Sequence, residues 1–281
     1  MIPPLPDVII EPVVRAALAE DLGHAGDVTS AATIDAQARL SCAFVARKSG
    51  VAAGLDCARL AIHALDPHAT FEAVVADGDT VQPGTVLARV EANARALLSA
   101  ERVALNLMGR MSGIASLTAD YVAEVKGTRA RITDTRKTTP GLRALEKYAV
   151  VCGGGVNHRF GLDDAILIKD NHVAACGSPA EALRRAQAHA GHLMKVEIEV
   201  DGLDQFDEVL PLKPDVILLD NFSLEDMRTA VHAVAGRAVL EASGGVSLEN
   251  VRAIAETGVN VISAGALTHS APALDVGLDA A

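Results

Sequence analysis

The sequence predicts an α/β protein in which an incomplete α/β barrel follows a smaller α+β domain. After Arg131 the chain alternates between strand-like and helix-like segments, and those strands are apolar throughout. Strands of this kind belong to a parallel sheet that is covered on both sides, most simply a barrel. Only about six of them can be counted, whereas a complete barrel has eight. We therefore expect an incomplete or irregular barrel.

Two helices are expected in the N-terminal half. Apolar residues at helical spacing run through residues 13–22 and stop at Gly23, a common helix terminator. A second helix should occupy most of residues 94–124. We expect a break in it near Ser112 and Gly113, because both residue types weaken a helix interior.

The strands and later helices follow from short local patterns. Ser178, Ser223 and Ser247 each precede acidic residues and a helical pattern, so each is expected to cap a helix. Turn signals bound the strands of the first domain. The predicted strands are 43–46 and 85–90 in the first domain, and 131–136, 165–169, 194–200, 216–220, 238–242 and 259–264 in the second.

Composition narrows the class of function. The 281-residue chain is half hydrophobic, which suits a globular protein with a sizeable core. A formal charge of -11, no Trp and two Tyr argue against a nucleic-acid partner. No apolar run reaches membrane length and no export signal is evident, so we expect a cytoplasmic protein without a membrane partner. The cysteines lack metal-binding spacing and are expected to be free thiols; they are Cys42, Cys57, Cys152 and Cys176.

One segment departs from the acidic character of the chain. Residues 131–172 carry a local excess of Lys and Arg, clustered where predicted strands end. Reactive groups of barrels lie at the C-terminal ends of strands. The alternative is a set of ordinary solvated charges on loops. The strand-end groups selected by this rule are Arg136, Lys137, Lys169, Glu199, Asp220, Glu241 and Ser243, and together they predict an anionic ligand.

Two kinds of strand end suggest a phosphorylated ligand. Glu199 and Asp220 end successive strands, where their carboxylates could hold Mg2+ together with phosphate oxygens. Alternatively, the two acids only bond neighbouring loop N–H groups. Small residues follow the last two strands and would let backbone N–H groups approach a phosphate. These residues are Ser243, Gly244 and Gly245, and then Ala264, Gly265 and Ala266.

Longer motifs resemble a known enzyme family. They are Asp134-Thr135-Arg136-Lys137-Thr138-Thr139-Pro140-Gly141-Leu142-Arg143, Gly153-Gly154-Gly155-Val156-Asn157-His158-Arg159 and Leu167-Ile168-Lys169-Asp170-Asn171-His172. This set is similar to quinolinate phosphoribosyltransferase, also called nicotinate-nucleotide pyrophosphorylase (carboxylating). The similarity spans nearly the whole chain.

The resemblance implies a specific architecture. It implies a seven-stranded α/β barrel joined to an N-terminal open sandwich. The expected domains are residues 1–112 and 113–266, with the tail 267–281 returning to the first domain. It also implies a homodimer in which Arg102, at the family's Glu-Arg position, enters the neighbouring subunit's site.

The resemblance also implies the reaction. Quinolinate and phosphoribosyl pyrophosphate would give nicotinate mononucleotide, carbon dioxide and pyrophosphate, with Mg2+ held by Glu199 and Asp220. Lys137, Lys169, Glu199 and Asp220 would be catalytic. The expected substrate-binding residues are Arg102, Thr135, Arg136, Lys137, His158, Arg159, Lys169, Glu199, Asp220, Ser243, Gly244, Gly245, Gly265 and Ala266.

The sequence leaves two other functions open. Lys169 could serve a Schiff-base aldolase, because a desolvated lysine at a barrel strand end can be a nucleophile. A paralogue of the same family is associated with molybdenum transport. The intact Thr135-Arg136-Lys137-Thr138 and Asn157-His158-Arg159 motifs argue against that paralogue.

Overall fold

The computed structural model describes residues 2–280 and divides into two compact units. The first unit runs to Ala119 and also contains residues 138–154 and the chain from Ser270 onward. The second contains Asp120–Lys137 and Gly155–His269. Residues 113–119 and 138–154, expected in the second domain, therefore group with the first unit.

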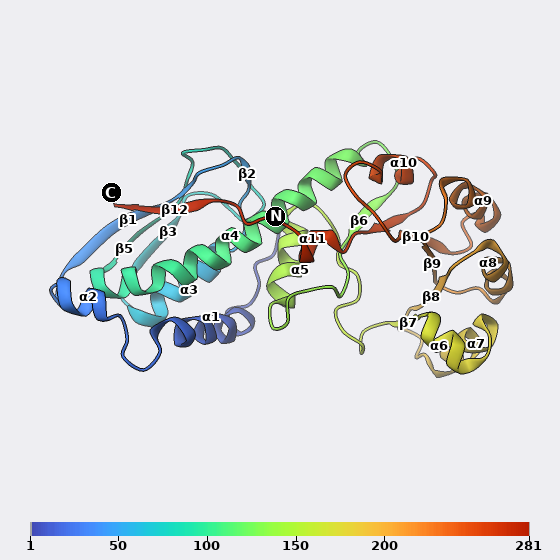
Figure 1. The fold of residues 1–281 in the computed structure, drawn as a ribbon, viewed down its shortest axis with the longest axis horizontal. Coiled ribbons are helices and arrows are strands. Elements are labelled where there is room, and N and C mark those ends of the chain that lie inside the picture. The colour runs from blue at the N-terminus through green and yellow to red at the C-terminus, as the bar shows by residue number, and fades with distance from the viewer. Residues whose placement is uncertain (1, 281) are drawn as a thin grey trace. The chain divides into compact units, whose positions relative to one another are not determined.

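The first unit is built on an antiparallel sheet with strand order β12-β1-β5-β3 (Figure 1). The C-terminal strand β12 pairs with β1 from Cys42↔Ala280 to Ala46↔Val276. A separate pair, β2 and β4, lies outside this sheet. The strands are β1 Arg39–Ala46, β2 Gly50–Val51, β3 Thr70–Ala73, β4 Thr80–Val81, β5 Val86–Asn93 and β12 Val276–Ala280.

Helices complete the first unit, and two of them test the sequence predictions. Helix α1 ends at Gly23, whose φ of 52° suits glycine, so the predicted stop is confirmed. Helix α4 has no break and runs continuously through residues 94–124. The bounds are α1 Asp7–Leu22, α2 Val28–Thr33, α3 Leu55–Leu65, α4 Ala94–Glu124 and α5 Arg143–Cys152.

Ser112 and Gly113 lie in an unbroken part of helix α4, and close packing against other segments explains why both residues are small. The Ser112 hydroxyl accepts a hydrogen bond from the Ala53 N–H at 2.9 Å and donates one to the Ala53 carbonyl at 3.0 Å. A Cβ at Gly113 would lie 1.9 Å from the carbonyl oxygen of Pro272. Neighbouring chain segments therefore need these two small residues in an intact helix.

The second unit contains one parallel sheet with strand order β6-β11-β10-β9-β8-β7. The predicted α/β fold is confirmed, but the sheet has six strands rather than seven. Val156 forms an isolated parallel bridge with Thr133, which adds one strand-like segment beside β6. The strands are β6 Arg131–Thr133, β7 Ile166–Ile168, β8 Val196–Val200, β9 Val216–Asp220, β10 Val239–Ser243 and β11 Val261–Ser263.

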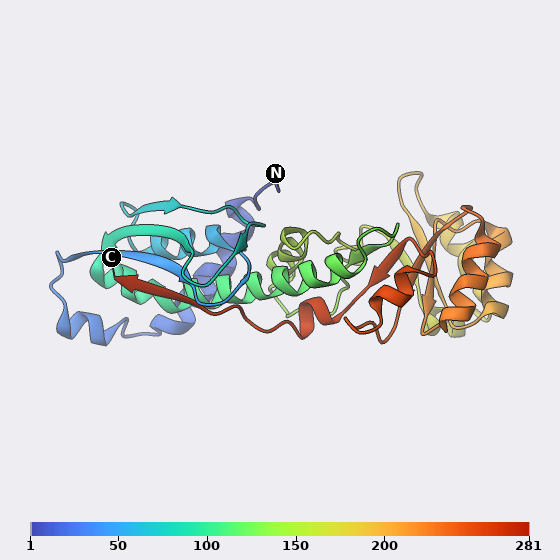
Figure 2. The same ribbon diagram turned by 90° about the horizontal axis from the view of Figure 1, so that it is seen from above.

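Helices α7, α8 and α9 form a layer along one face of this sheet (Figures 1 and 2). As predicted, Ser178 and Ser223 cap helices: their side chains accept hydrogen bonds from the Glu181 N–H at 3.2 Å and the Asp226 N–H at 3.1 Å. The helices are α6 Asp170–Cys176, α7 Pro179–His189, α8 Leu203–Val209, the 3-10 turn η1 Leu210–Leu212, α9 Leu224–Val234, α10 Val251–Ala255 and α11 Ala266–His269.

The predicted cap at Ser247 is wrong. Helix α10 begins only at Val251. The Asn250 side chain accepts a hydrogen bond from the Ser247 N–H and donates one to the Gly245 carbonyl, both at 2.9 Å. Residues 245–250 therefore form a turn closed by Asn250 instead of the first turn of a helix.

Two further expectations concern the whole described chain. Within residues 2–280, no helix combines the length and hydrophobicity needed to span a membrane. All four cysteines are free, and Cys42, Cys57 and Cys152 are buried. The prediction of free thiols is confirmed.

Candidate active site

A pocket of about 600 Å³ lies in the second unit, at the C-terminal ends of its strands. Parallel strands end at a common edge, so groups far apart in sequence meet there. Most of the predicted site residues line this pocket. They are Thr135, Arg136, Lys137, His158, Arg159, Lys169, Glu199, Asp220, Ser243, Gly244 and Gly245. Leu167, Leu218, Asn221, Glu241 and Ser263 line it as well.

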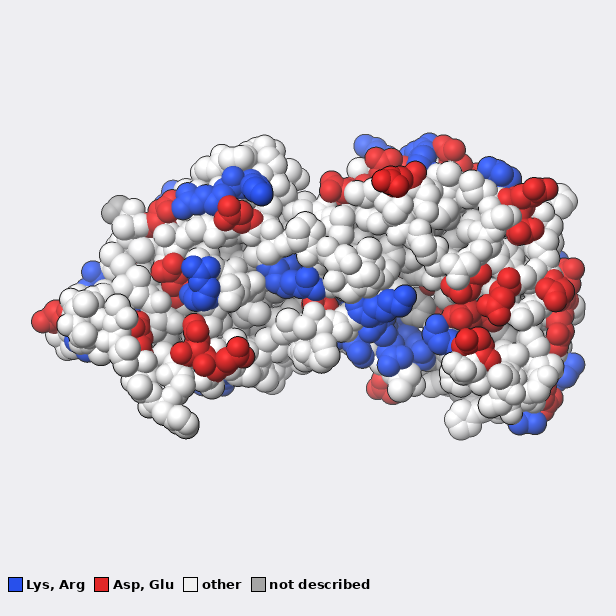
Figure 3. Space-filling view, viewed as in Figure 1, with Lys and Arg blue, Asp and Glu red and all other residues white. Residues whose placement is uncertain are grey.

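Two half-buried arginines line the pocket. The Nε atoms of Arg136 and Arg159 are both buried and have no hydrogen-bond partner. Burial lowers the pKa of Arg159, and the nearby Arg136 lowers it further. Two adjacent guanidinium groups with unpartnered donors are suited to an anion with several acceptor oxygens. Figure 3 shows Lys and Arg side chains gathered beside Asp and Glu side chains on one face of the molecule.

A tight loop presents Arg159 to the pocket. The Asp164 carboxylate closes the loop by accepting hydrogen bonds from the Phe160 N–H at 2.6 Å and the Gly161 N–H at 3.0 Å. Arg159 Nη1 donates to the Ala165 carbonyl at 3.2 Å. This bond ties the guanidinium group to the far end of the loop.

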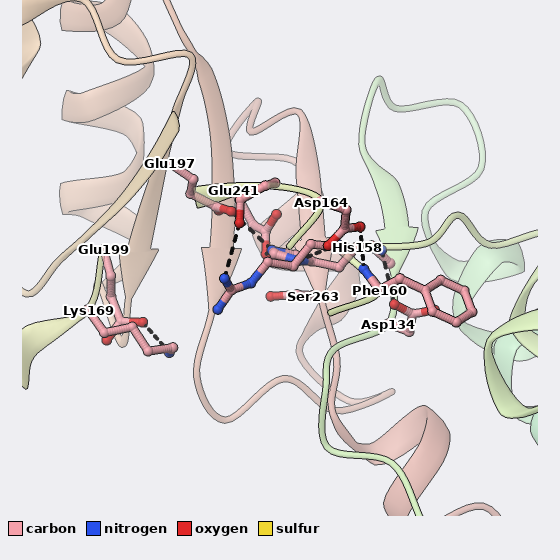
Figure 4. Close-up of polar contacts among 12 residues, drawn as sticks. Asp134, His158, Phe160, Asp164, Lys169, Glu197, Glu199, Glu241 and Ser263 are labelled. Carbon is pink, nitrogen blue, oxygen red and sulfur yellow. Dashed lines mark hydrogen bonds and ion pairs between the residues drawn. The ribbon is translucent and has the colours of Figure 1, made fainter. Parts of the chain in front are cut away.

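His158 ties the same loop to the sheet. Its backbone N–H donates to the fully buried Asp134 at 3.0 Å, and its Nδ1 accepts the Arg159 N–H at 2.7 Å. On the other side of the ring, Nε2 lies 3.1 Å from Glu197 Oε2 and 3.6 Å from Glu241 Oε1. Figure 4 shows the two carboxylates and the imidazole converging.

Neither of the two buried carboxylates was assigned a role from the sequence. The strand-end rule selected Glu241 without a role and missed Glu197. Burial, and then the charge of Glu197, raises the pKa of Glu241 to about 7. The alternation Val196-Glu197-Ile198-Glu199-Val200 was the available signal, because it directs both glutamates to the same face of β8.

An acidic group lies on the pocket wall formed by β8 and β9. Glu199, Asp201 and Asp220 each place a carboxylate oxygen within 4.8 Å of the others. The predicted pair of acids is therefore brought together, and Asp201 joins it. Lys169 Nζ lies 2.7 Å from Glu199 Oε2, and Asn221 donates to Asp220 at 2.8 Å. Three carboxylate oxygens are hard donors of the kind that Mg2+ prefers.

The glycine turn after β10 has little room for side chains. The Asn221 N–H donates to the Ser243 carbonyl at 3.0 Å. Gly244 has a φ of 91°, and a Cβ there would lie 2.1 Å from Asn221 Oδ1. Glycine is therefore required at residue 244, and the backbone of the turn stays open to the pocket.

Three of the predicted site residues are not part of the lining of this pocket. Arg102 lies exposed on α4 in the first unit. Gly265 and Ala266 lie behind Lys137: a Cβ at Gly265 would be 2.9 Å from the Lys137 Cδ. Thr268 in the same segment donates to the Lys137 carbonyl at 2.7 Å. This segment supports the loop that carries Lys137.

Sequence comparisons match both parts of the chain to one enzyme family. Residues 27–112 match the family model "Quinolinate phosphoribosyl transferase, N-terminal domain" and residues 114–279 match the corresponding C-terminal domain. Nicotinate-nucleotide pyrophosphorylase [carboxylating] of Mycobacterium leprae is 50% identical over 95% of both chains. The probable enzyme of the same name from Bacillus subtilis is 44% identical over 92% of this chain and 89% of its own.

A solved structure shows the same fold. The nicotinate-nucleotide pyrophosphorylase from Francisella tularensis superposes with a TM-score of 0.95 at 37% identity, covering 100% of this chain and 99% of that one. Both domain matches, the identity over nearly full length and the shared fold lead to one conclusion. The chain belongs to the quinolinate phosphoribosyltransferase family.

Proposed function

We propose that this protein transfers the phosphoribosyl group of phosphoribosyl pyrophosphate to quinolinate, with loss of carbon dioxide, in the de novo synthesis of NAD. The products are nicotinate mononucleotide, carbon dioxide and pyrophosphate. The observation that carries the proposal is the pair of buried, unpartnered Nε atoms of Arg136 and Arg159 in a pocket that also holds an acidic group and an open glycine turn.

The arginine side of the pocket suits quinolinate. This substrate carries two neighbouring carboxylates, and charge-assisted hydrogen bonds to charged groups contribute about 1.5–3 kcal/mol each. Arg136 and Arg159 supply the paired donors, and Thr135 and His158 line the same pocket. Charge and hydrogen-bond geometry would together hold the pyridine ring in one orientation.

The acidic group and the glycine turn of the pocket suit phosphoribosyl pyrophosphate. The open backbone at Ser243, Gly244 and Gly245 offers N–H groups to a phosphate. Glu199 and Asp220, joined by Asp201, would hold Mg2+. When bound, that ion would offset the negative charge that develops on departing pyrophosphate. Lys137 and Lys169 add positive charge near the same groups.

The proposed reaction requires the enzyme mainly to position the two substrates. The ring nitrogen of quinolinate forms a bond to the anomeric carbon of the ribose as the bond to pyrophosphate breaks. The C2 carboxylate then leaves as carbon dioxide, its electron pair stays at C2 beside the positive ring nitrogen, and a proton joins C2. The protein holds the two substrates in line and retains the other carboxylate. No covalent bond to the enzyme is required.

The proposal includes a homodimer with shared sites. Arg102 is exposed on α4 and makes no ion pair or hydrogen bond with the described part of the chain. An exposed, unengaged guanidinium group is available to a partner subunit's anionic ligand. In a two-fold dimer both sites would receive Arg102 in this way.

The aldolase alternative loses its support in the structure. A lysine nucleophile must be neutral when it attacks a carbonyl. Lys169 is half exposed instead of desolvated, and its Nζ atom is engaged by the Glu199 carboxylate at 2.7 Å instead of facing an apolar pocket. The curated relatives from Mycobacterium leprae and Bacillus subtilis are named for pyrophosphorylase activity, and neither name refers to molybdenum transport.

An assay with purified protein tests the proposed function. Quinolinate, phosphoribosyl pyrophosphate and Mg2+ should give nicotinate mononucleotide, and omission of either substrate should abolish it. Nicotinate should be a poor substitute, because one carboxylate leaves cations of the site unpaired. We expect at least a 100-fold lower kcat/KM for nicotinate, on the order of the cost of one or two unpaired charged donors. Comparable turnover of the two acids would contradict the diacid site.

A further inference from the structure

His158, Glu197 and Glu241 form a cluster in which two carboxylates face a single imidazole hydrogen. His158 Nδ1 accepts the Arg159 N–H, so the ring hydrogen lies on Nε2. That single hydrogen faces two carboxylates, at 3.1 Å and 3.6 Å. Glu197 and Glu241 are only 7% and 4% exposed, and the Oε1 atom of each has no hydrogen-bond partner. One imidazole hydrogen cannot satisfy two buried carboxylates at once.

The surroundings of Glu241 favour a neutral carboxyl. Its cross-strand neighbours Leu218 on β9 and Val261 on β11 are apolar. The other groups that act on it are Glu197 on β8 and Asp134 after β6, which disfavour its charge, and His158 and Ser263, which favour it. Burial and the two acids outweigh the imidazole and the hydroxyl, so the pKa of Glu241 rises to about 7.

The same geometry argues against a metal ion at this cluster. A metal would need the lone pair of Nε2, while Nδ1 already uses its own lone pair to accept the Arg159 N–H. The ring would then carry no hydrogen at all. A proton shared within the cluster satisfies the observed contacts better.

We propose that Glu241 is the proton-accepting residue of the substrate pocket and that binding of a dianionic substrate is coupled to uptake of a proton by its carboxyl group. The inference rests on the proposed function, since it takes quinolinate as the dianion. Glu241 lines the same pocket as Arg136 and Arg159. Once neutral, it adds no negative charge to the pocket that would repel the substrate carboxylates.

The coupling has a definite sign. A bound dianion raises the pKa of Glu241 above its value of about 7 in the free protein. Between the two pKa values the complex holds more protons than the free protein does. Quinolinate affinity should therefore fall as the pH rises above about 7, approaching tenfold per pH unit for one coupled proton. Quinolinate adds no proton of its own there, because carboxylic acids titrate near pH 4.

Titration calorimetry of quinolinate binding in two buffers with different ionisation heats measures the proton count. At about pH 8 the unaltered protein should take up most of one proton. Glu241→Gln mimics the neutral carboxyl, so it should bind quinolinate without proton uptake and with an affinity that is flat in pH. Glu256→Gln, a surface carboxylate paired with Arg252, is the matched control and should behave like the unaltered protein.

The outcomes separate the two proposals. If the unaltered protein does not bind quinolinate, the proposed function is wrong. If it binds with no buffer dependence, or if the dependence persists in Glu241→Gln, the role of Glu241 is wrong and the function stands. Should Glu241→Gln fail to fold, infrared difference spectra of the unaltered protein decide: a protonated-carboxyl band must appear when quinolinate binds, and its absence overturns the inference.

Discussion

Replacing Arg159 with alanine is expected to weaken quinolinate binding by roughly 10- to 150-fold while changing the affinity for phosphoribosyl pyrophosphate little. The change removes charge-assisted bonds worth about 1.5–3 kcal/mol and leaves a carboxylate of the diacid underpaired. Arg136→Ala should have the same effect, because the unpartnered Nε atoms of the two arginines are equivalent in kind. Calorimetry with each ligand separately measures both losses.

A surface arginine supplies the control for this experiment. Arg185 lies exposed on α7 in an ion pair with Glu181, on the helical layer of the second unit. Arg185→Ala should leave both affinities unchanged. If Arg136→Ala and Arg159→Ala weaken both ligands equally, the two arginines bind phosphate or maintain the fold, and the assignment of a diacid subsite is wrong.

Arg102→Ala and Glu199→Ala proteins should each be nearly inactive alone and should recover activity when their subunits are mixed. In the proposed dimer each site combines Arg102 of one chain with Glu199 of the other. A mixed dimer then has one site with both defects and one intact site. Random pairing makes half of the dimers mixed, so about a quarter of the activity of the unaltered protein should return.

The mixing experiment is informative only if subunits exchange between dimers, so exchange must be measured. Pull-down of an untagged chain with a tagged one shows exchange directly, and mixing tagged and untagged Arg102→Ala chains is the control that should restore nothing. If exchange occurs and activity stays absent, Arg102 acts within its own chain or supports the fold. The shared-site proposal would then be wrong.

Local rules predicted the parts of the site that depend on strand direction. Parallel strands end at one edge, so the sequence alone groups Lys169, Glu199, Asp220 and Ser243, and all four line the pocket. The caps at Ser178 and Ser223 were equally predictable. Their hydrogen bonds span three residues and depend on local sequence alone.

Features that depend on distant segments could not be predicted in this way. Gly113 looks like a helix breaker in sequence, but its small size accommodates Pro272, which is far along the chain. Glu197 lies inside a strand, where a charged residue is usually excluded, and only the meeting with His158 explains it. Gly265 likewise makes room for Lys137 instead of contacting a ligand. Each case requires knowledge of a partner more than 30 residues away.

A crystal structure of the protein with quinolinate tests the central claim most directly, namely that the unpartnered guanidinium donors of Arg136 and Arg159 serve the substrate's carboxylates. The account predicts carboxylate oxygens within about 3 Å of both guanidinium groups and both Nε atoms partnered. Quinolinate bound elsewhere in the protein, or bound in this pocket while both Nε atoms stay without a partner, would contradict it.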